Sequence, residues 1–238
     1  MADFDAYASL PLIREGFPRT IRLVASARLR EAVLAPLADS EDELDALNEV
    51  EGSTSARLIA EHRGIGSLAP DELVYAVPYA SFINASFVYA KPRQAMRFNP
   101  ATRGAWYAAL DIETCIAEVG FHLTRALADV DDFNAVVDYG EMIASMSGLF
   151  VDLRTKADHP SLDPNIEHGY AEGNRLAAWA RSQAHNGIVY PSVRRQQGIC
   201  IVALRPGVVQ SVVPGALHRL TWSGTADFTW VQLSDSLS

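Results

Sequence analysis

The chain lacks several features that would point to a specialised class of protein. Only two of its 238 residues are cysteine, and both Cys115 and Cys200 stand between apolar neighbours. We therefore expect buried free thiols in a reducing compartment and no disulfide framework. No apolar run approaches the roughly 20 residues of a membrane helix, and the first residues do not resemble a signal peptide. These absences predict a cytoplasmic protein without a membrane partner.

Positive charge is also scarce, and the common motifs for phosphates and metals are missing. Lys and Arg number 20 against 29 Asp and Glu, a net charge of −9, so direct nucleic-acid binding is not expected. The six histidines form no HExxH or Cys/His cluster, and we expect no metal. No GxGxxG, GxxxxGK[ST] or GxSxG motif occurs. A serine hydrolase stays open, because its triad is assembled in space.

What the sequence does contain is the composition and periodicity of one folded domain. Hydrophobic residues make up 49% and charged residues 21% of the chain, which is ordinary for a domain with a full core. Helical spacing is found at 28–50, and a second short helix is predicted at 55–62. Residues 72–90 are rich in Val, Tyr, Phe and Ala, and we expect extended segments there. We predict a single domain over 1–238 with a helical insertion at about 28–70.

The second half of the chain mixes strand and helix signals. Asp111 is predicted to cap a helix after a buried strand at 104–110, and Asn165–His185 is predicted to form another helix. The apolar stripe of the first helix consists of Ile112, Cys115, Ile116, Val119 and Leu123. Further strands are expected at 135–139, 148–153, 187–190 and 199–204, with two or three more within 208–233. Because strands and helices do not alternate strictly, we predict an α+β fold with a central mixed β core and flanking helices.

Four local features carry the groups that a dinucleotide-cleaving enzyme needs. They are Arg97-Phe98-Asn99-Pro100 before a turn, Tyr107 in the apolar strand, Glu118 on the flank of the helical stripe, and Tyr190-Pro191-Ser192-Val193-Arg194 at the end of a strand. Breaking the nicotinamide–ribose bond passes through an oxocarbenium-like state, which a carboxylate can stabilise. Arginine suits the pyrophosphate oxygens, and an aromatic face can hold the nicotinamide ring.

Taken alone, each of these residues has an ordinary structural interpretation. Arg97 is typical of an exposed loop, Tyr107 of a core tyrosine, Glu118 of a solvated helix and Ser192 of a turn. The residues by themselves indicate a soluble α+β domain with an anion site. A non-catalytic interaction module whose arginines hold an anionic partner therefore stays open beside an enzyme.

The order of these pieces resembles the core of RES-domain proteins, a family named for its arginine, glutamate and serine. The similar stretches are the Arg97–Pro100 segment, Gly104–Ala109, Glu113–His122, and Gly187–Arg194 followed by Gly198 and the strand at 199–204. Thr20–Val24 resembles the upstream arginine strand of the family over a shorter stretch. The segment Arg28–Ala90 is longer than in the most compact members of the family and is similar in layout to the larger RES toxins of ParT type.

The resemblance implies a toxin of a toxin–antitoxin pair, with a fold similar to the ADP-ribosyltransferases of diphtheria-toxin type. Members of the family cleave NAD+ and send ADP-ribose to water, to phosphate or to a protein. We therefore expect NAD+ as the substrate and a protein acceptor such as phosphoribosyl pyrophosphate synthetase. A small helical antitoxin of Xre/ParS type is the expected partner. An NAD+ glycohydrolase or phosphorylase that depletes cellular NAD+ is the alternative.

The resemblance also assigns roles to individual residues of this chain. Glu118 would serve the ribose and its developing charge, Arg97 would bind the ribose or the phosphates, and Ser192 would orient the substrate. These three are the expected catalytic residues. The expected substrate-binding residues are Arg22, Tyr107, Phe98, Asn99 and Tyr190. Two positions depart from the family pattern, because Asn99-Pro100 replaces a more Gly-rich turn and Leu23 follows Arg22 where some members carry an aromatic residue.

Overall fold

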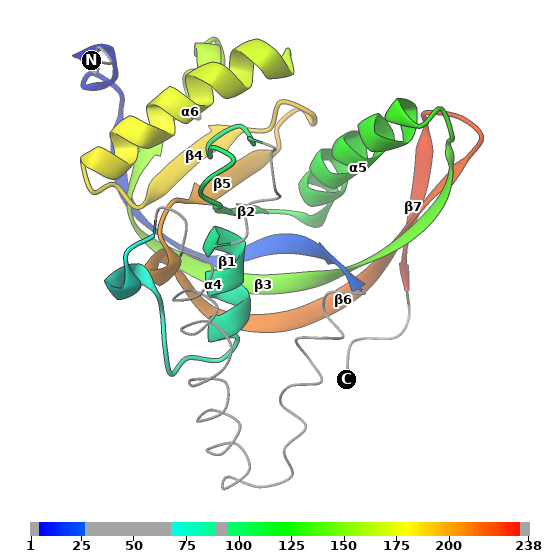
Figure 1. Ribbon diagram of the computed structural model, residues 1–238, viewed down its shortest axis with the longest axis horizontal. Helices are drawn as coiled ribbons and strands as arrows, with labels where there is room; N and C mark the ends of the chain where they lie inside the picture. Colours follow the sequence, from blue (N-terminus) through cyan, green and yellow to red (C-terminus); the bar gives the residue numbers. More distant parts are fainter. Residues whose placement is uncertain (1–4, 27–67, 89–94, 234–238) are drawn as a thin grey trace, which may run out of the picture.

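The computed structural model describes residues 5–26, 68–88 and 95–233, which form one mixed α/β domain (Figure 1). In this part of the chain, seven β-strands form one sheet and three α-helices pack against it. A mixed β core with flanking helices is therefore confirmed. The helices predicted at 28–50 and 55–62, and nearly all of the insertion predicted at 28–70, lie outside the described residues.

The sheet combines parallel and antiparallel pairs of strands that are mostly distant in sequence. Its order is β1-β2-β5-β4-β3-β6-β7, with an additional pairing between β1 and β3. Only the β3–β4 pair is parallel among the described strands. The strands are β1 (Leu12–Ala25), β2 (Trp106–Ala109), β3 (Asn134–Asp152), β4 (Gly187–Pro191), β5 (Ile199–Ala203), β6 (Val209–Ser223) and β7 (Phe228–Leu233).

The longest strand, β3, organises this sheet. Its first part pairs with β6, and its last residues, Phe150–Asp152, pair with β4 on the same edge. β1 runs along the other edge of β3 for most of its length, and the pairing of Ile21 with Ala109 joins β1 to β2. The separate strands predicted at 135–139 and 148–153 are therefore one continuous strand. The physical reason is that β1 supplies hydrogen-bond partners across the stretch between them.

The helices divide between the two faces of the sheet. α5 (Ile112–Asp129) and α6 (Ile166–Ser182) lie above the sheet in Figure 1, whereas α4 (Ala80–Val88) overlaps β1 and β3 in that view. Ile116 of α5 and Leu176 of α6 belong to one hydrophobic cluster, which we call the upper core. Phe87 of α4 and Trp106 of β2 belong to a second cluster, the lower core. The short 3₁₀ helices are η1 (Asp5–Tyr7), η2 (Pro70–Glu72), η3 (Pro160–Leu162) and η4 (Pro206–Val208).

The start and the inner face of α5 agree with the sequence prediction. Asp111 is the N-cap, and its carboxylate accepts a hydrogen bond from the Thr114 backbone N–H at 2.8 Å. The predicted stripe packs into or against the upper core through Ile112, Cys115, Ile116, Val119 and Leu123. Both features are local consequences of residue type and helical period, which is why the sequence could predict them.

The extended segments predicted at 72–90 are wrong where α4 stands. Ile83 and Phe87 lie one helical turn apart, and both are almost completely buried. The Asn84 side chain then ties the helix to the preceding loop, because it donates to the Val74 carbonyl and accepts from the Val74 N–H. An aromatic-rich run with few polar positions carries a weak period, so tertiary packing decided its conformation.

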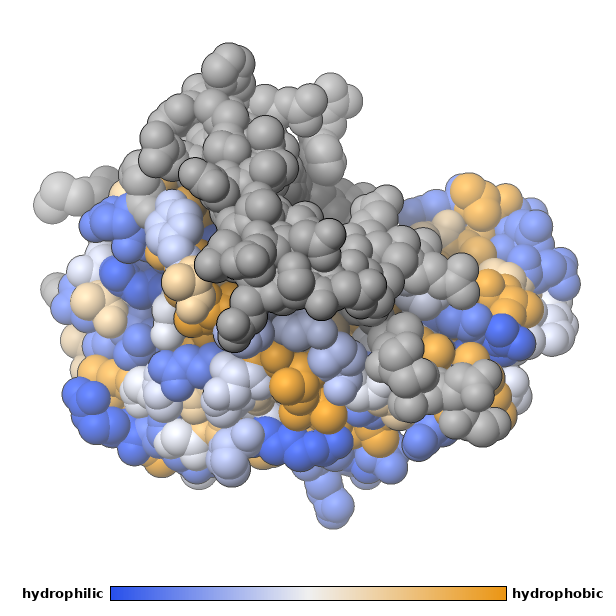
Figure 2. All heavy atoms as spheres, turned by 90° about the horizontal axis from the view of Figure 1, so that it is seen from below, coloured by the Kyte–Doolittle hydropathy of each residue, from blue (hydrophilic) through white to orange (hydrophobic). Residues whose placement is uncertain are grey.

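The remaining observations concern the surface of the described residues and the two cysteines. Figure 2 shows the molecule from below, where hydrophilic and hydrophobic residues are mixed over the described surface. In the described ranges no helix is long and apolar enough to span a membrane. Cys115 and Cys200 are free and buried, as the sequence predicted.

Candidate functional site

A cavity of about 220 Å³ is bordered by α5, α6 and the strands β1 and β2. Glu118, Arg97 and Tyr107 line it together with Cys115, the near neighbour of Glu118 on α5. Residues that lie far from them in the sequence also line it, and these include Tyr170, Tyr190, Arg194 and Cys200. A second cavity of about 660 Å³ adjoins the first and shares part of its wall. The shared residues are Arg22, Leu23, Met96, Val119, His122 and Tyr170.

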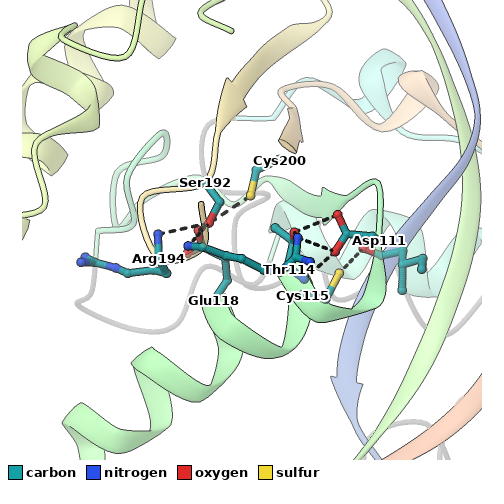
Figure 3. Close-up of polar contacts among 9 residues, drawn as sticks. Asp111, Thr114, Cys115, Glu118, Ser192, Arg194 and Cys200 are labelled. Carbon is teal, nitrogen blue, oxygen red and sulfur yellow. Dashed lines mark hydrogen bonds and ion pairs between the residues drawn. The ribbon is translucent and has the colours of Figure 1, made fainter. Parts of the chain in front are cut away.

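Glu118 of α5 and Ser192, which follows β4, point toward one another beside the first cavity (Figure 3). The Ser192 hydroxyl donates a 2.7 Å hydrogen bond to Glu118 Oε1. Ser192 Oγ also accepts the backbone N–H groups of Arg194 at 3.1 Å and Arg195 at 3.0 Å. These two donors occupy the lone-pair side of the hydroxyl and turn its hydrogen toward the carboxylate. The Ser192 hydroxyl is therefore fixed by three hydrogen bonds, and it in turn holds the Glu118 carboxylate.

The Cys200 thiol is a second donor to the same carboxylate oxygen, with a distance of 3.7 Å from Sγ to Glu118 Oε1. Burial raises the pKa of the Cys200 thiol well above its usual range, and the nearby Glu118 carboxylate adds to the rise. The thiol therefore keeps its proton at neutral pH. Because both hydrogen bonds reach Oε1, Oε2 is the oxygen that can accept a hydroxyl of a bound ligand.

Arg97 reaches the cavity from the segment before β2 and is held by the loop that precedes α6. Its Nη1 donates to the carbonyl oxygens of Ser161 at 2.5 Å and Asp163 at 3.1 Å. Its guanidinium carbon lies 5.3 Å from the centre of the Tyr170 ring. Arg97 is only 7% exposed. Its contacts are made with carbonyl oxygens and an aromatic ring, and among the described residues no carboxylate forms an ion pair with it. Such a buried charge favours an anionic ligand.

Two glycines let α6 approach Arg97 closely. A Cβ atom at Gly169 would lie 2.7 Å from Arg97 Nη1, and one at Gly173 would overlap the Arg97 carbonyl oxygen. Glycine in a helix interior costs about 0.5–1 kcal/mol of stability relative to alanine. The two glycines are therefore explained by the close packing of α6 against Arg97, which a larger residue would prevent. Sequence reasoning missed Tyr170 and the α6 wall of the cavity. Two glycines four residues apart within a predicted helix were the signal that could have revealed it.

Arg194 is a second cation in the cavity wall, to which the sequence analysis gave no role of its own. Its guanidinium carbon lies 3.4 Å from the centre of the Phe121 ring, and its Nη2 donates to the Pro164 carbonyl at 3.2 Å. Burial lowers the pKa of Arg194, and the nearby Arg97 lowers it further. The two guanidinium groups therefore gather positive charge at one wall of an otherwise acidic protein.

The other predicted binding residues divide between the cavity surface and the wall behind it. Tyr107 and Tyr190 line the cavity, and the Tyr107 hydroxyl accepts the Phe98 N–H at 2.9 Å and donates to Asn99 Oδ1 at 2.8 Å. Phe98 is fully buried, with its ring centre 4.8 Å from that of Tyr190. Among the described residues, Phe98 and Asn99 do not line this cavity. Their contact with substrate stays a prediction that the geometry does not favour, because they shape the turn that carries Arg97.

Arg22 borders both cavities, but its side chain does not share the face that carries Glu118. Ile21 and Leu23 pack in the upper core beneath α5. The guanidinium carbon of Arg22 instead lies 4.7 Å from the centre of the Trp106 ring, which belongs to the lower core. This alternation is the normal consequence of strand geometry. A role for Arg22 in substrate binding stays a prediction, and its setting differs from that of Arg97.

The chemistry available at this site rests on a carboxylate, two guanidinium groups and aromatic walls. Within the described ranges, no group of three or more His, Cys, Asp and Glu side chains is arranged to hold a metal ion. Glu118 and Arg97 line one cavity, and Ser192 is joined to it through Glu118. The site can bind an anionic ligand and stabilise a positive charge that develops beside the carboxylate.

Comparison with known proteins adds a family match to this geometry. The family described as RES domain matches residues 73–223, which is well over half of the chain and includes the four residues Arg97, Tyr107, Glu118 and Ser192. The uncharacterized protein y4oC of Sinorhizobium fredii is 27% identical over 186 residues, or 78% of this chain and 75% of that protein. The crystal structure of the M. tuberculosis MbcT–MbcA toxin–antitoxin complex is similar over 52% of this chain and 73% of the matched chain. The two chains are 18% identical, and the TM-score is 0.38.

Proposed function

This chain belongs to the RES domain family, and on that premise we propose that it cleaves the nicotinamide–ribose bond of NAD+ and transfers ADP-ribose to an acceptor. The observation that carries the proposal is the Glu118 carboxylate, oriented by Ser192 at 2.7 Å, at a cavity that also presents Arg97 and Arg194. Within the proposal, the mixed sheet with helices on both faces corresponds to a fold similar to the ADP-ribosyltransferases.

The proposed reaction needs little acid catalysis and depends on charge stabilisation. The bond from the ribose C1 to the nicotinamide nitrogen breaks, and its electron pair leaves with nicotinamide, which becomes a neutral molecule. Positive charge then develops on the ribose ring, where Glu118 stabilises it and its Oε2 accepts a ribose hydroxyl. The acceptor forms a new bond to C1 and loses its proton to water. Ser192 contributes by holding Glu118 in the orientation that this charge requires.

The two adjoining cavities suit the two ends of a dinucleotide. The first cavity, of about 220 Å³, would hold the nicotinamide and its ribose, and the second, of about 660 Å³, has room for the adenosine end. Together they fall in the range of about 300–1,000 Å³ that is typical of ligand pockets. In this proposal Tyr107 packs against the nicotinamide ring, while Arg97 and Arg194, which both line the first cavity, bind the pyrophosphate.

The proposed acceptor and partner rest on the resemblance to the family and not on the cavity. We propose a protein acceptor, with phosphoribosyl pyrophosphate synthetase as the first candidate, and a toxin role within the cytoplasm. A small helical antitoxin of Xre/ParS type is proposed to bind the chain and cover the site. Water or phosphate as the acceptor would make the protein a glycohydrolase or a phosphorylase.

The experiment that tests this function is incubation of the purified protein with NAD+, followed by separation of the products. We expect free nicotinamide together with a mass increase of one ADP-ribose on a lysate protein. Free ADP-ribose or ADP-ribose 1″-phosphate would assign the acceptor to water or phosphate instead. No nicotinamide release in buffer, in phosphate or with lysate would refute the proposal and leave a non-catalytic anion-binding module.

A matched pair of variants tests the proposed pyrophosphate contact. Arg194→Met keeps an unbranched side chain over the Phe121 ring but removes the charge, and we expect the KM for NAD+ to rise about tenfold, as loss of a charge-assisted contact implies. Arg175→Met is the control, because Arg175 is an exposed residue of α6 whose side chain is 67% exposed. Equal KM values for the two variants would exclude Arg194 from pyrophosphate binding.

A further inference from the structure

The segment that follows β4 forms a tight loop around Ser192. The Ser192 N–H donates to the Gly198 carbonyl at 2.7 Å, and the Gly198 N–H donates to the Arg195 carbonyl at 3.2 Å. Gln197 in the same loop has a φ of 62°, a value that side-chain-bearing residues rarely adopt. We call residues 192–198 the serine loop. Its conformation determines where the Ser192 hydroxyl lies relative to Glu118.

The serine loop approaches the first turn of α5 at a place where a larger residue would not fit. A Cβ atom at Gly198 would lie 2.5 Å from Thr114 Oγ1 and 3.1 Å from Ser192 Cβ. The first turn itself is held by Asp111, which accepts the Thr114 N–H at 2.8 Å and the Thr114 hydroxyl at 2.9 Å. The same helix carries Glu118 one turn further along.

Arg195 connects these two parts through both its backbone and its side chain. Its backbone N–H donates to Ser192 Oγ at 3.0 Å. Its Nη1 donates to Thr114 Oγ1 at 3.1 Å and forms an ion pair with Asp111 Oδ1 at 3.3 Å. We call these contacts the Arg195 bridge. One residue thus ties the hydroxyl that orients Glu118 to the helix that carries Glu118.

We propose that Arg195 is a positioning residue for catalysis, which locks the serine loop onto the start of α5 and so sets the direction of the Glu118 carboxylate. This inference rests on the proposed NAD+-cleaving function. The bridge acts through geometry, because Arg195 does not line the cavity among the described residues. Displacement of a catalytic group by about 1 Å can lower a rate about a hundredfold.

The exposure of the bridge separates a positioning role from a merely stabilising one. The side chains of Arg195 and Asp111 are 37% and 36% exposed, and ion pairs this exposed to solvent contribute little to stability. Removal of the Arg195 side chain is therefore expected to leave the fold intact. The effect of the removal should appear as faster amide exchange in the serine loop and as a lower kcat.

The test compares four variants of the full chain. Arg195→Ala removes the bridge, and Arg195→Lys keeps the charge without the planar fork. Asp111→Asn keeps a good N-cap residue but removes the ion pair. Arg219→Ala is the control, because it breaks a surface ion pair with Asp138 between β6 and β3, outside the site. Nicotinamide release gives kcat and KM, and hydrogen exchange of the amides of 192–198 is followed in the substrate-free protein.

We expect Arg195→Ala to lower kcat at least tenfold with KM within about twofold, and to speed amide exchange in the serine loop. Arg195→Lys should recover part of the rate, Asp111→Asn should lose several-fold, and Arg219→Ala should match the wild type. Wild-type kcat in Arg195→Ala, with or without faster exchange, would overturn the inference. Equal losses in Arg195→Ala and Arg219→Ala would also overturn it. A wild-type protein that releases no nicotinamide would instead refute the proposed function, and unchanged exchange in Arg195→Ala would then still exclude the bridge.

Discussion

Replacement of Glu118 by glutamine separates the charge of this residue from its structural contact. The Ser192 hydroxyl donates to Glu118 Oε1 at 2.7 Å, and the glutamine carbonyl oxygen can accept the same hydrogen bond. The stability change should therefore be limited to the difference between a charge-assisted and a neutral hydrogen bond, about 1 kcal/mol. Glu118 lies at the edge of the stripe of α5, so the buried face of the helix is untouched.

The loss of charge should be much more costly for the proposed reaction. A carboxylate about 4 Å from a developing unit charge contributes about 4 kcal/mol at an effective dielectric constant near 20. Removal of that interaction from the transition state corresponds to a rate loss of about a thousandfold. We therefore expect Glu118→Gln to be folded, to bind NAD+ and to release nicotinamide about a thousand times more slowly than the wild type.

The assay combines nicotinamide release, NAD+ titration calorimetry and urea unfolding of both proteins. Glu113→Gln is the matched control, since Glu113 is an exposed carboxylate of the same helix, and its turnover should equal that of the wild type. A folded Glu118→Gln protein that retains more than a tenth of wild-type turnover would refute the reasoning. So would an equal loss of turnover in Glu113→Gln.

Three further predictions concern α6, the half-buried His159 and the thiols. Gly173→Ala should lower the free energy of unfolding by about 1–3 kcal/mol in urea titrations, because its Cβ would overlap the Arg97 carbonyl oxygen; a more stable variant would contradict this close approach. Burial lowers the pKa of His159, whose Nδ1 accepts the Ser161 N–H. The unfolded chain therefore binds protons more readily, so stability should fall as the pH drops below about 6.5. His159→Asn should lose less stability than the wild type between pH 7 and pH 5, as measured by urea titrations. An equal loss in the two proteins would contradict the prediction. Burial raises the pKa of Cys115 to about 12 and that of Cys200 well above its usual range. Iodoacetamide at pH 8 should therefore leave both thiols unmodified in the native protein and alkylate both after unfolding, and mass spectrometry would reveal native-state alkylation as the contrary result.

The local features of the chain could be predicted from the sequence alone. The cap at Asp111 and the apolar stripe that follows it depend on neighbours within a few residues, and both are present as predicted. The burial of Cys115 and Cys200 likewise follows from their apolar context. The α4 helix was misassigned because its aromatic-rich sequence lacks a clear period, and the continuity of β3 was missed because its partner strand β1 lies far away in the sequence.

For the candidate site, the sequence by itself supplied the residue types and, through their order, the family to which the chain belongs. Arg97, Glu118 and Ser192 could be selected as candidate site residues because each stands in a recognisable local pattern. Only the tertiary structure decided which way these side chains face. Strand alternation carries the Arg22 side chain onto Trp106, while the approach of the serine loop to α5 brings Ser192 to Glu118 across 74 positions of sequence. Local patterns report the period of a segment, but the contact between distant segments depends on how their faces pack, and only the folded chain contains that information.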